Sequence, residues 1–380
     1  MRRLRLGMVG GGDGAFIGGV HRMAARLDDR YELVAGALSS DAARAHASAA
    51  RLHIPADRSY ADFREMARAE AARPDGIDIV SIVTPNHLHA PAALAFLAAG
   101  INVICDKPMT HTLADANAVA AAVDHSGKLF ALTHNYTGYP MVRQARAMIQ
   151  SGELGAIRVV QVEYPQAWLA TDLEAGGQKQ ASWRTDPARA GAAGAVGDIG
   201  THAFNLAEFV AGLECETLAA ELSRFVPGRR RDDHAHMLLR FNGGARGMLF
   251  ASQIAPGADN ALALRIYGEK PSLAWRQETP EYLIFTPLGL QPQRLRRGGP
   301  GLDPAATHAT RLPAGHPEGY LEAFAQLYSD VAEQITARLE ARAPDPNALL
   351  VPSVAQGLRG MRFITAAVAS SAANAAWTAI

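Results

Sequence analysis

The chain places an aspartate and a histidine four residues apart in an otherwise apolar, glycine-broken stretch, GDIGTHAFN at residues 197–205. On a helix this spacing puts Asp198 and His202 on one face, with Cβ atoms roughly 5–6 Å apart. A carboxylate beside an imidazole raises the imidazole pKa and orients the ring, which suits a general base that takes a hydroxyl proton. Two other uses stay open, a helix cap with a core histidine and a metal site. We predict no metal, because no nearby His, Cys or Glu offers an obvious third ligand.

A glycine-rich turn, GGGDGAFIGG at residues 10–19, follows the first apolar run. Residues without Cβ let a pyrophosphate approach free N–H groups at the positive end of a helix. We assign the tight turn to Gly10, the close approach of the pyrophosphate to Gly12, and the contact between helix and strand to Gly18. The spacing is not a strict G-x-G-x-x-G, since Ala15 holds the sixth place, and we infer a short insertion there. The alternative, a mobile loop, would not explain glycine in both the turn and the helix.

The end of the second apolar run, ALSSDAAR at residues 37–44, decides between two cofactors. Ser39, Ser40 and Arg44 suit the 2′-phosphate of NADP. Asp41 suits the ribose 2′-OH of NAD. We therefore predict NAD or NADP, with a slight preference for NADP.

The elements that must position these residues follow two patterns. Short β-branched runs alternate with alanine-rich amphipathic stretches up to residue 134, which predicts a Rossmann-type, doubly wound parallel sheet. Residues 135–380 show longer alternating strands, and NGG at 242–244 separates two of them as a hairpin turn would. We predict an α+β domain there with a large, mostly antiparallel open sheet. Two C-terminal helices, over about 317–341 and 353–373, close the chain and can pack back on the first domain.

Two further motifs, TPNHLH at 84–89 and CDKPMT at 105–110, stand at the ends of predicted strands, where doubly wound sheets bind ligands. Together with the glycine turn and GDIGTH they resemble the Gfo/Idh/MocA family of oxidoreductases, over nearly the whole chain. The resemblance implies that Lys107, Asp198 and His202 form the reacting triad. It also implies a cis peptide before Pro108, as in relatives.

The resemblance further assigns residues to the cofactor and to the substrate. Asp106 replaces the glutamate of the family pattern, and Thr137 stands where relatives often have an arginine. His89 has an alternative role as a packed histidine at a helix start. The expected cofactor contacts beyond the glycine turn and the second strand end are Thr84, Pro85, Asn86, His89, Asp106, Lys107 and Asn135. The expected substrate contacts are Lys107, Tyr136, Trp168, Trp183, Arg184, Asp198 and His202.

The segment GGQKQASWRTDP at 176–187 supports a sugar substrate, since aromatic rings stack on sugar faces and polar side chains bind hydroxyls. A loop that packs on a partner subunit is the alternative for its Lys179 and Gln180. We expect an NAD(P)-dependent sugar or cyclitol dehydrogenase. In it, hydride goes to C4 of nicotinamide and the proton to His202, while Lys107 stabilises charge on the substrate oxygen. Two rivals are a redox-silent sugar or nucleotide sensor of this fold, and a lyase or isomerase with tightly held NAD.

Composition narrows the class of partner. The formal net charge of the 380 residues is zero, so no long-range field attracts nucleic acid or an anionic membrane. The partner is expected to be a small molecule, with a homodimer or homotetramer formed through the open sheet. Two cysteines exclude a disulfide framework and, without a signal peptide or membrane span, indicate the cytoplasm. We interpret the arginine runs at 229–231 and 294–297 as solvated loop charge.

Overall fold

The computed structural model describes residues 2–380, and the chain divides into two compact units. The first unit comprises Met1–Asn135 and Tyr320–Leu358, and the second comprises Tyr136–Gly319 and Arg359–Ile380. Each unit is built around its own sheet.

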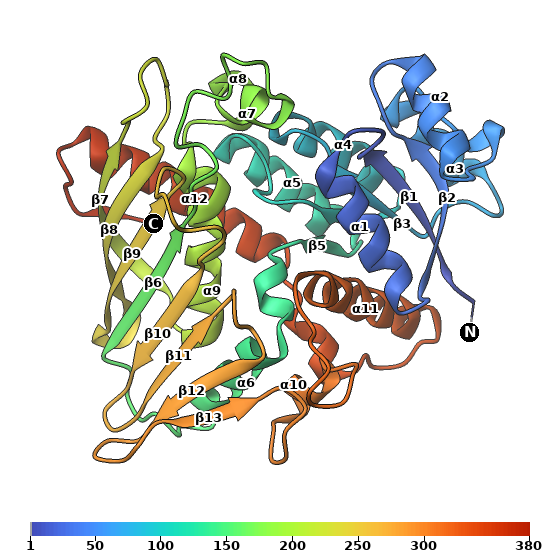
Figure 1. Cartoon of the computed structure of the whole chain (residues 1–380). Coiled ribbons are helices and arrows are strands. Elements are labelled where there is room, and N and C mark those ends of the chain that lie inside the picture. The colour runs from blue at the N-terminus through green and yellow to red at the C-terminus, as the bar shows by residue number, and fades with distance from the viewer. Residues whose placement is uncertain (1) are drawn as a thin grey trace. The chain divides into compact units, whose positions relative to one another are not determined.

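The first unit contains a five-stranded parallel sheet of order β2-β1-β3-β4-β5, which confirms the predicted Rossmann-type architecture (Figure 1). All residues of β3 are buried, as expected for a strand in a sheet covered on both faces. The strand order changes direction between β1 and β3, and ligands bind at such a switch point. The strands are β1 (Leu4–Gly10), β2 (Tyr31–Ala37), β3 (Ile79–Val83), β4 (Asn102–Cys105) and β5 (Phe130–Leu132). The helices are α1 (Phe16–Leu27), α2 (Ala42–Arg51), α3 (Phe63–Ala72), α4 (His89–Ala98) and α5 (Leu113–Ser126).

A late helix, α11 (Tyr320–Leu339), also belongs to the first unit and lies beside α1 in Figure 1. Its buried side chains Phe324 and Val331 share one apolar cluster with Val20 and Ala24 of α1. The segment 320–358 thus groups with the parallel sheet, so the first unit is not continuous in sequence. The physical cause is the apolar face of α11, which covers α1 and the sheet.

The second unit contains a nine-stranded sheet of order β13-β12-β11-β10-β6-β9-β8-β7-β14. Only the central pair β6 and β9 runs parallel, so the predicted large, mostly antiparallel sheet is confirmed. The NGG turn joins the antiparallel strands β8 and β9, as expected. The strands are β6 (Val159–Pro165), β7 (Cys215–Ser223), β8 (His234–Phe241), β9 (Arg246–Ser252), β10 (Ala263–Tyr267), β11 (Ser272–Arg276), β12 (Tyr282–Thr286), β13 (Gln293–Arg296) and β14 (Thr378–Ala379).

Two helices of the second unit, α6 (Pro140–Gln150) and α9 (Thr201–Ala211), pack against each other and against this sheet (Figure 1). Side chains of β8 alternate between buried and exposed, so only one face of this strand is covered within the chain. The shorter helices are α7 (Lys179–Arg184), α8 (Pro187–Ala190) and α10 (Pro304–His308). The division between the units falls within α12 (Val354–Ala372).

The arginine runs of the second unit are solvated only in part, which corrects the prediction, since Arg230, Arg294 and Arg296 are exposed and the other three arginines are not. Arg229, Arg231 and Arg297 are buried. Arg297 pairs with Glu281 at 2.7 Å and with Glu318 at 2.9 Å. Buried guanidinium groups need such partners, because an unpaired charge in the interior is costly. These arginines therefore hold loops together.

None of the helices in residues 2–380 combines the length and the apolar character that a membrane crossing requires.

Candidate active site

The glycine turn after β1 has the backbone that a pyrophosphate site needs. Gly10 and Gly11 have φ angles of +77° and +69°, which side chains with Cβ rarely adopt. A Cβ on Gly12 would lie 2.6 Å from the Leu38 carbonyl oxygen, and one on Gly18 would lie 2.3 Å from Gly11 Cα. The turn thus brings main-chain atoms close together at the start of α1, where a helix attracts anions.

Two buried polar atoms at the carboxyl edge of the parallel sheet fit a bound dinucleotide. Thr84 Oγ1 and Asn135 Nδ2 are buried and lack a hydrogen-bond partner among residues 2–380. Thr84 follows β3 and Asn135 follows β5, so both stand at the carboxyl edge of the sheet. Burying a polar atom without a partner costs free energy, which a polar ligand at this edge would offset. Pro85 and Asn86 continue the same loop, and Asn86 is buried.

The end of β2 lies on the surface. Asp41 caps α2, where its side chain accepts a hydrogen bond from the Arg44 amide at 2.8 Å, and Ser39 Oγ accepts from the Asp41 amide at 3.2 Å. The Arg44 and Ser40 side chains are exposed. Exposed serine and arginine side chains leave room for a 2′-phosphate, whereas the Asp41 carboxylate is partly committed to the cap.

Lys107 follows β4 in a turn with a cis Lys107–Pro108 peptide, as the resemblance implied. Asp106 Oδ1 accepts hydrogen bonds from the Lys107 amide at 2.9 Å and from Thr133 Oγ1 at 2.8 Å. Burial acts to raise the pKa of Asp106, but contact with His21 and the nearby positive charges outweigh it and keep this pKa below its usual range. An ionised Asp106 therefore holds the main chain of Lys107.

Both ring nitrogens of His89 contact main-chain carbonyl groups, so this side chain has a structural role. Nδ1 lies 2.8 Å from the Pro108 carbonyl oxygen and Nε2 lies 2.8 Å from the Thr84 carbonyl oxygen. The ring therefore connects the two loops that follow β3 and β4. Burial lowers the pKa of His89, although Asp106 and the two carbonyl groups act to raise it.

Another buried histidine, His134, was not singled out from the sequence. It follows β5, and burial together with the positive charge of Lys107 lowers its pKa to about 3. The ring is therefore neutral at physiological pH. In the sequence, the feature that could have indicated His134 is a polar residue directly after a short apolar strand.

In the second unit, Asp198 lies in a π-helical turn, Val196–Gly200, that runs directly into α9. The Thr201 amide donates to the Val196 carbonyl, five residues back, and such turns are frequent at functional sites. Asp198 Oδ2 accepts from Gln253 Nε2 at 2.8 Å and lies 3.6 Å from Arg184 Nε. The cap considered for Asp198 is wrong, because the residue lies inside a continuous helical segment rather than before one.

His202 is buried, with 7% of its surface exposed, among aromatic rings. The Tyr136 ring meets it edge-on at 4.8 Å between centroids, and the Tyr164 ring does so at 6.3 Å. Tyr136 and Tyr164 share a hydrogen bond of 2.5 Å, and the Tyr164 hydroxyl donates to Asn260 at 2.7 Å. Burial raises the pKa of Tyr136, so its hydroxyl stays protonated. Tyr164 and Asn260 were missed from the sequence.

Arg184 connects the segment 179–184 to Asp198. Its guanidinium lies 4.3 Å from the centre of the Trp183 ring and also donates to Gln180. The predicted substrate residues Trp183 and Arg184 are therefore linked to the predicted acid–base pair. Gln253, the other partner of Asp198, was missed. The sequence signal that could have indicated Gln253 is a polar residue directly after the apolar end of a predicted strand, and this residue is buried.

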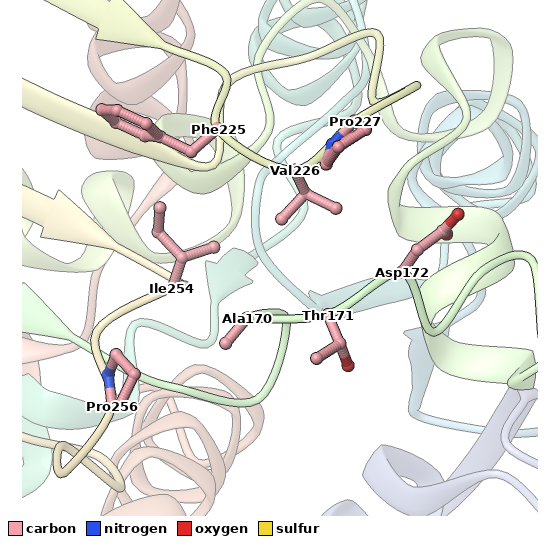
Figure 2. A pocket seen from close by; sticks show the side chains of 8 residues that line it. All are labelled: Ala170, Thr171, Asp172, Phe225, Val226, Pro227, Ile254 and Pro256. Atoms are coloured by element: carbon pink, nitrogen blue, oxygen red, sulfur yellow. The ribbon is translucent and has the colours of Figure 1, made fainter.

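Trp168 is half-buried in the loop after β6, two residues before a surface pocket of about 400 Å³. Figure 2 shows that three loop segments meet around this pocket, and most of its lining is apolar. Its lining residues are Ala170, Thr171, Asp172, Phe225, Val226, Pro227, Ile254 and Pro256. None of the predicted substrate residues is among them.

Within residues 2–380, no three His, Cys, Asp or Glu side chains are arranged to hold a metal ion.

Comparisons with known proteins give the family. Residues 4–134 match the model described as oxidoreductase family, NAD-binding Rossmann fold, and residues 142–274 match the GFO/IDH/MocA C-terminal domain. An oxidoreductase structure from Sinorhizobium meliloti is 53% identical, with 99% of each chain covered and a TM-score of 0.91. An inositol dehydrogenase homologue from Azotobacter vinelandii, complexed with NADH and myo-inositol, is 34% identical with a TM-score of 0.92 over 100% of this chain and 98% of that one.

Levoglucosan dehydrogenase from Pseudarthrobacter phenanthrenivorans is 30% identical over 311 residues, which are 74% of this chain and 76% of the relative. The first matched range, 4–134, includes the glycine turn and Lys107, and the second, 142–274, includes Asp198 and His202. The chain is therefore a member of the Gfo/Idh/MocA family of NAD-binding oxidoreductases.

Proposed function

We propose that the chain is an NAD(P)-dependent dehydrogenase that oxidises a secondary alcohol of a sugar, a sugar derivative or a cyclitol. The observation that carries the proposal is the polar set around Asp198 in an otherwise apolar helical segment. Asp198 contacts Gln253 and Arg184 from the π-helical turn, and His202, four residues later in α9, packs on two tyrosines. Relatives named for levoglucosan and crystallised with myo-inositol support a hydroxyl-bearing ring as substrate.

In this proposal each side chain has a defined task. His202 accepts the proton of the substrate hydroxyl, and Asp198 stabilises the imidazolium that results. Lys107 stabilises the negative charge that develops on the substrate oxygen. Bound NAD or NADP would accept the hydride from the carbon, which leaves a ketone. Gly10, Gly12, Thr84 and Asn135 would hold the cofactor.

The decisive experiment is a screen of sugars, anhydrosugars and inositols for reduction of NAD and of NADP, read at 340 nm. With the best substrate, Lys107→Ala and His202→Ala should each lower kcat by orders of magnitude, while NADH or NADPH fluorescence titration shows binding unchanged. Normal turnover in both variants would contradict the mechanism. A sensor would bind sugar without reducing either cofactor, and a lyase or isomerase would convert sugar without net cofactor reduction.

We also propose that the chain forms a homodimer or homotetramer through the open face of the nine-stranded sheet. Leu238 of β8 and Met248 of β9 are cross-strand partners, and 58% and 39% of their surfaces are exposed. Adjacent exposed apolar side chains of this size favour burial against another surface. Light scattering should show an oligomer, and Leu238→Arg should shift it toward the monomer. A monomeric parent chain would disprove this part.

A further inference from the structure

A fully buried histidine of the first unit, His21, contacts side chains from two other elements. Its Nδ1 lies 2.8 Å from the Tyr328 hydroxyl of α11 and 3.2 Å from the Ser81 hydroxyl of β3. The two hydroxyls are 2.9 Å apart from each other. The Phe324 ring meets the imidazole edge-on, with 5.1 Å between centroids. The ring of His21 is thus fixed from one side by hydroxyl groups and from another by an aromatic residue.

The other ring nitrogen faces the turn that carries Lys107. His21 Nε2 lies 3.9 Å from Asp106 Oδ1 and has no hydrogen-bond partner among residues 2–380. This distance exceeds a hydrogen bond but lies within the range over which ionised groups affect each other. A facing carboxylate favours a proton on Nε2 whether the ring is neutral or charged. In the neutral ring, Nδ1 then accepts from the Tyr328 hydroxyl.

Asp106 lies between His21 and the main chain of Lys107. The same Oδ1 atom that faces His21 also accepts from the Lys107 amide and from Thr133 Oγ1. Six titratable groups lie near this carboxylate: His21 on α1, His89 on α4, His134 after β5, Tyr328 on α11, and Cys105 and Lys107 on either side of Asp106. Of these, His21 is the group that also hydrogen-bonds the Tyr328 hydroxyl of α11.

We infer that His21 is a positioning residue for Lys107, because its Nε2 proton faces the Asp106 carboxylate across 3.9 Å and attracts it electrostatically, and that carboxylate in turn accepts a hydrogen bond from the Lys107 amide. This inference rests on the proposed function only where it predicts an effect of His21 on the rate of turnover. The placement of Lys107 can be observed without a substrate, so failure of the dehydrogenase proposal and failure of this inference are distinguishable.

Two substitutions of the same residue separate packing from proton donation. His21→Leu fills the buried site with an apolar side chain but removes the N–H group at Nε2. His21→Gln keeps an N–H near the place of Nε2. A purely structural role would make leucine the better replacement, whereas the inferred role makes glutamine the better one. Tyr31→Phe is the matched control, because Tyr31 also donates a buried hydrogen bond to α11, to the Tyr328 carbonyl at 2.8 Å.

The first measurement uses the scarcity of lysine. The chain has four lysines, so lysine labelled with ¹³C at Cε gives four signals, and Lys107→Arg identifies that of Lys107. The chemical shift of this signal at neutral pH reports the surroundings of Lys107. In His21→Leu the signal should move, because the carboxylate that holds the Lys107 main chain loses a stabilising partner. In His21→Gln and Tyr31→Phe the signal should stay close to its position in the parent chain.

The second measurement is kinetic, with the substrate that the screen identifies. His21→Leu should lower kcat on the order of tenfold or more, since a displaced reacting group costs rate rather than binding. The KM for cofactor should stay within a factor of about three, and His21→Gln should recover most of the rate. If His21→Leu does not fold, Tyr328→Phe removes only the hydroxyl that orients Nδ1 and serves the same test. An unmoved Lys107 signal in His21→Leu, or a glutamine variant that shifts this signal as far as leucine does, overturns the inference.

Discussion

His134 gives the sharpest prediction about stability, because its pKa differs most clearly between the folded and the unfolded chain. Burial and the charge of Lys107 lower the folded-state value to about 3, against 6.5 in the unfolded chain. As pH falls below 6.5, the unfolded chain binds a proton that the folded chain rejects, so stability is lost on acidification and continues to fall toward pH 3. At pH 5 this single group costs about 2 kcal/mol relative to neutral pH.

His134→Asn removes the titrating group and should make unfolding less sensitive to acid. Urea unfolding followed by circular dichroism at pH 7 and pH 5 gives the free energy of unfolding at each pH. The decrease from pH 7 to pH 5 should be smaller in the variant by about 2 kcal/mol. His125→Asn, on the exposed side of α5, is the control and should leave the decrease unchanged. Equal decreases in the parent and in His134→Asn would refute the assignment of a neutral buried imidazole.

Three further outcomes are expected. Gly18→Ala should abolish NADH binding in a fluorescence titration, because its Cβ would lie 2.3 Å from a main-chain atom, whereas Gly19→Ala, with 4.0 Å to its nearest neighbour, should bind normally. Arg297→Met should lower the free energy of unfolding by about 3–5 kcal/mol, since it removes the guanidinium partner of the buried Glu318 and of the partly buried Glu281, and the exposed Arg296→Met should cost less than about 1 kcal/mol. Gln253→Leu removes a donor to the aspartate of the acid–base pair, so kcat should fall while the Kd for NADH is unchanged; an unaltered pH–rate profile would count against that role.

Features set by local rules were predictable from the sequence. The glycine turn, the loop of Thr84 and the Lys107 turn could be placed because strand, turn and helix follow one another in the chain, and because parallel strands end at one edge of a sheet. The alternation of β8 likewise predicted a strand with one buried face.

Contacts between distant residues were not predictable. His21 and Tyr328 are 307 positions apart, and no periodicity marks such a pair. Arg297 lies among exposed-type residues in sequence, yet it is buried because carboxylates at 281 and 318 reach it. Composition indicates how many charges a chain carries, but only tertiary structure decides which of them lie inside.

The π-helical turn at Val196–Gly200 has a consequence for how related sequences should be compared. A turn of this kind holds one residue more than an α-helix would, so losing a single residue there would restore a regular helix. The backbone after Thr201 would keep its place, while Asp198 would rotate by roughly 100° about the helix axis. Relatives that keep both the aspartate and the histidine but differ by one residue between them would therefore present the carboxylate to a different part of the fold. The position of a gap in an alignment, as well as residue identity, therefore decides whether the arrangement of Asp198 and His202 is retained.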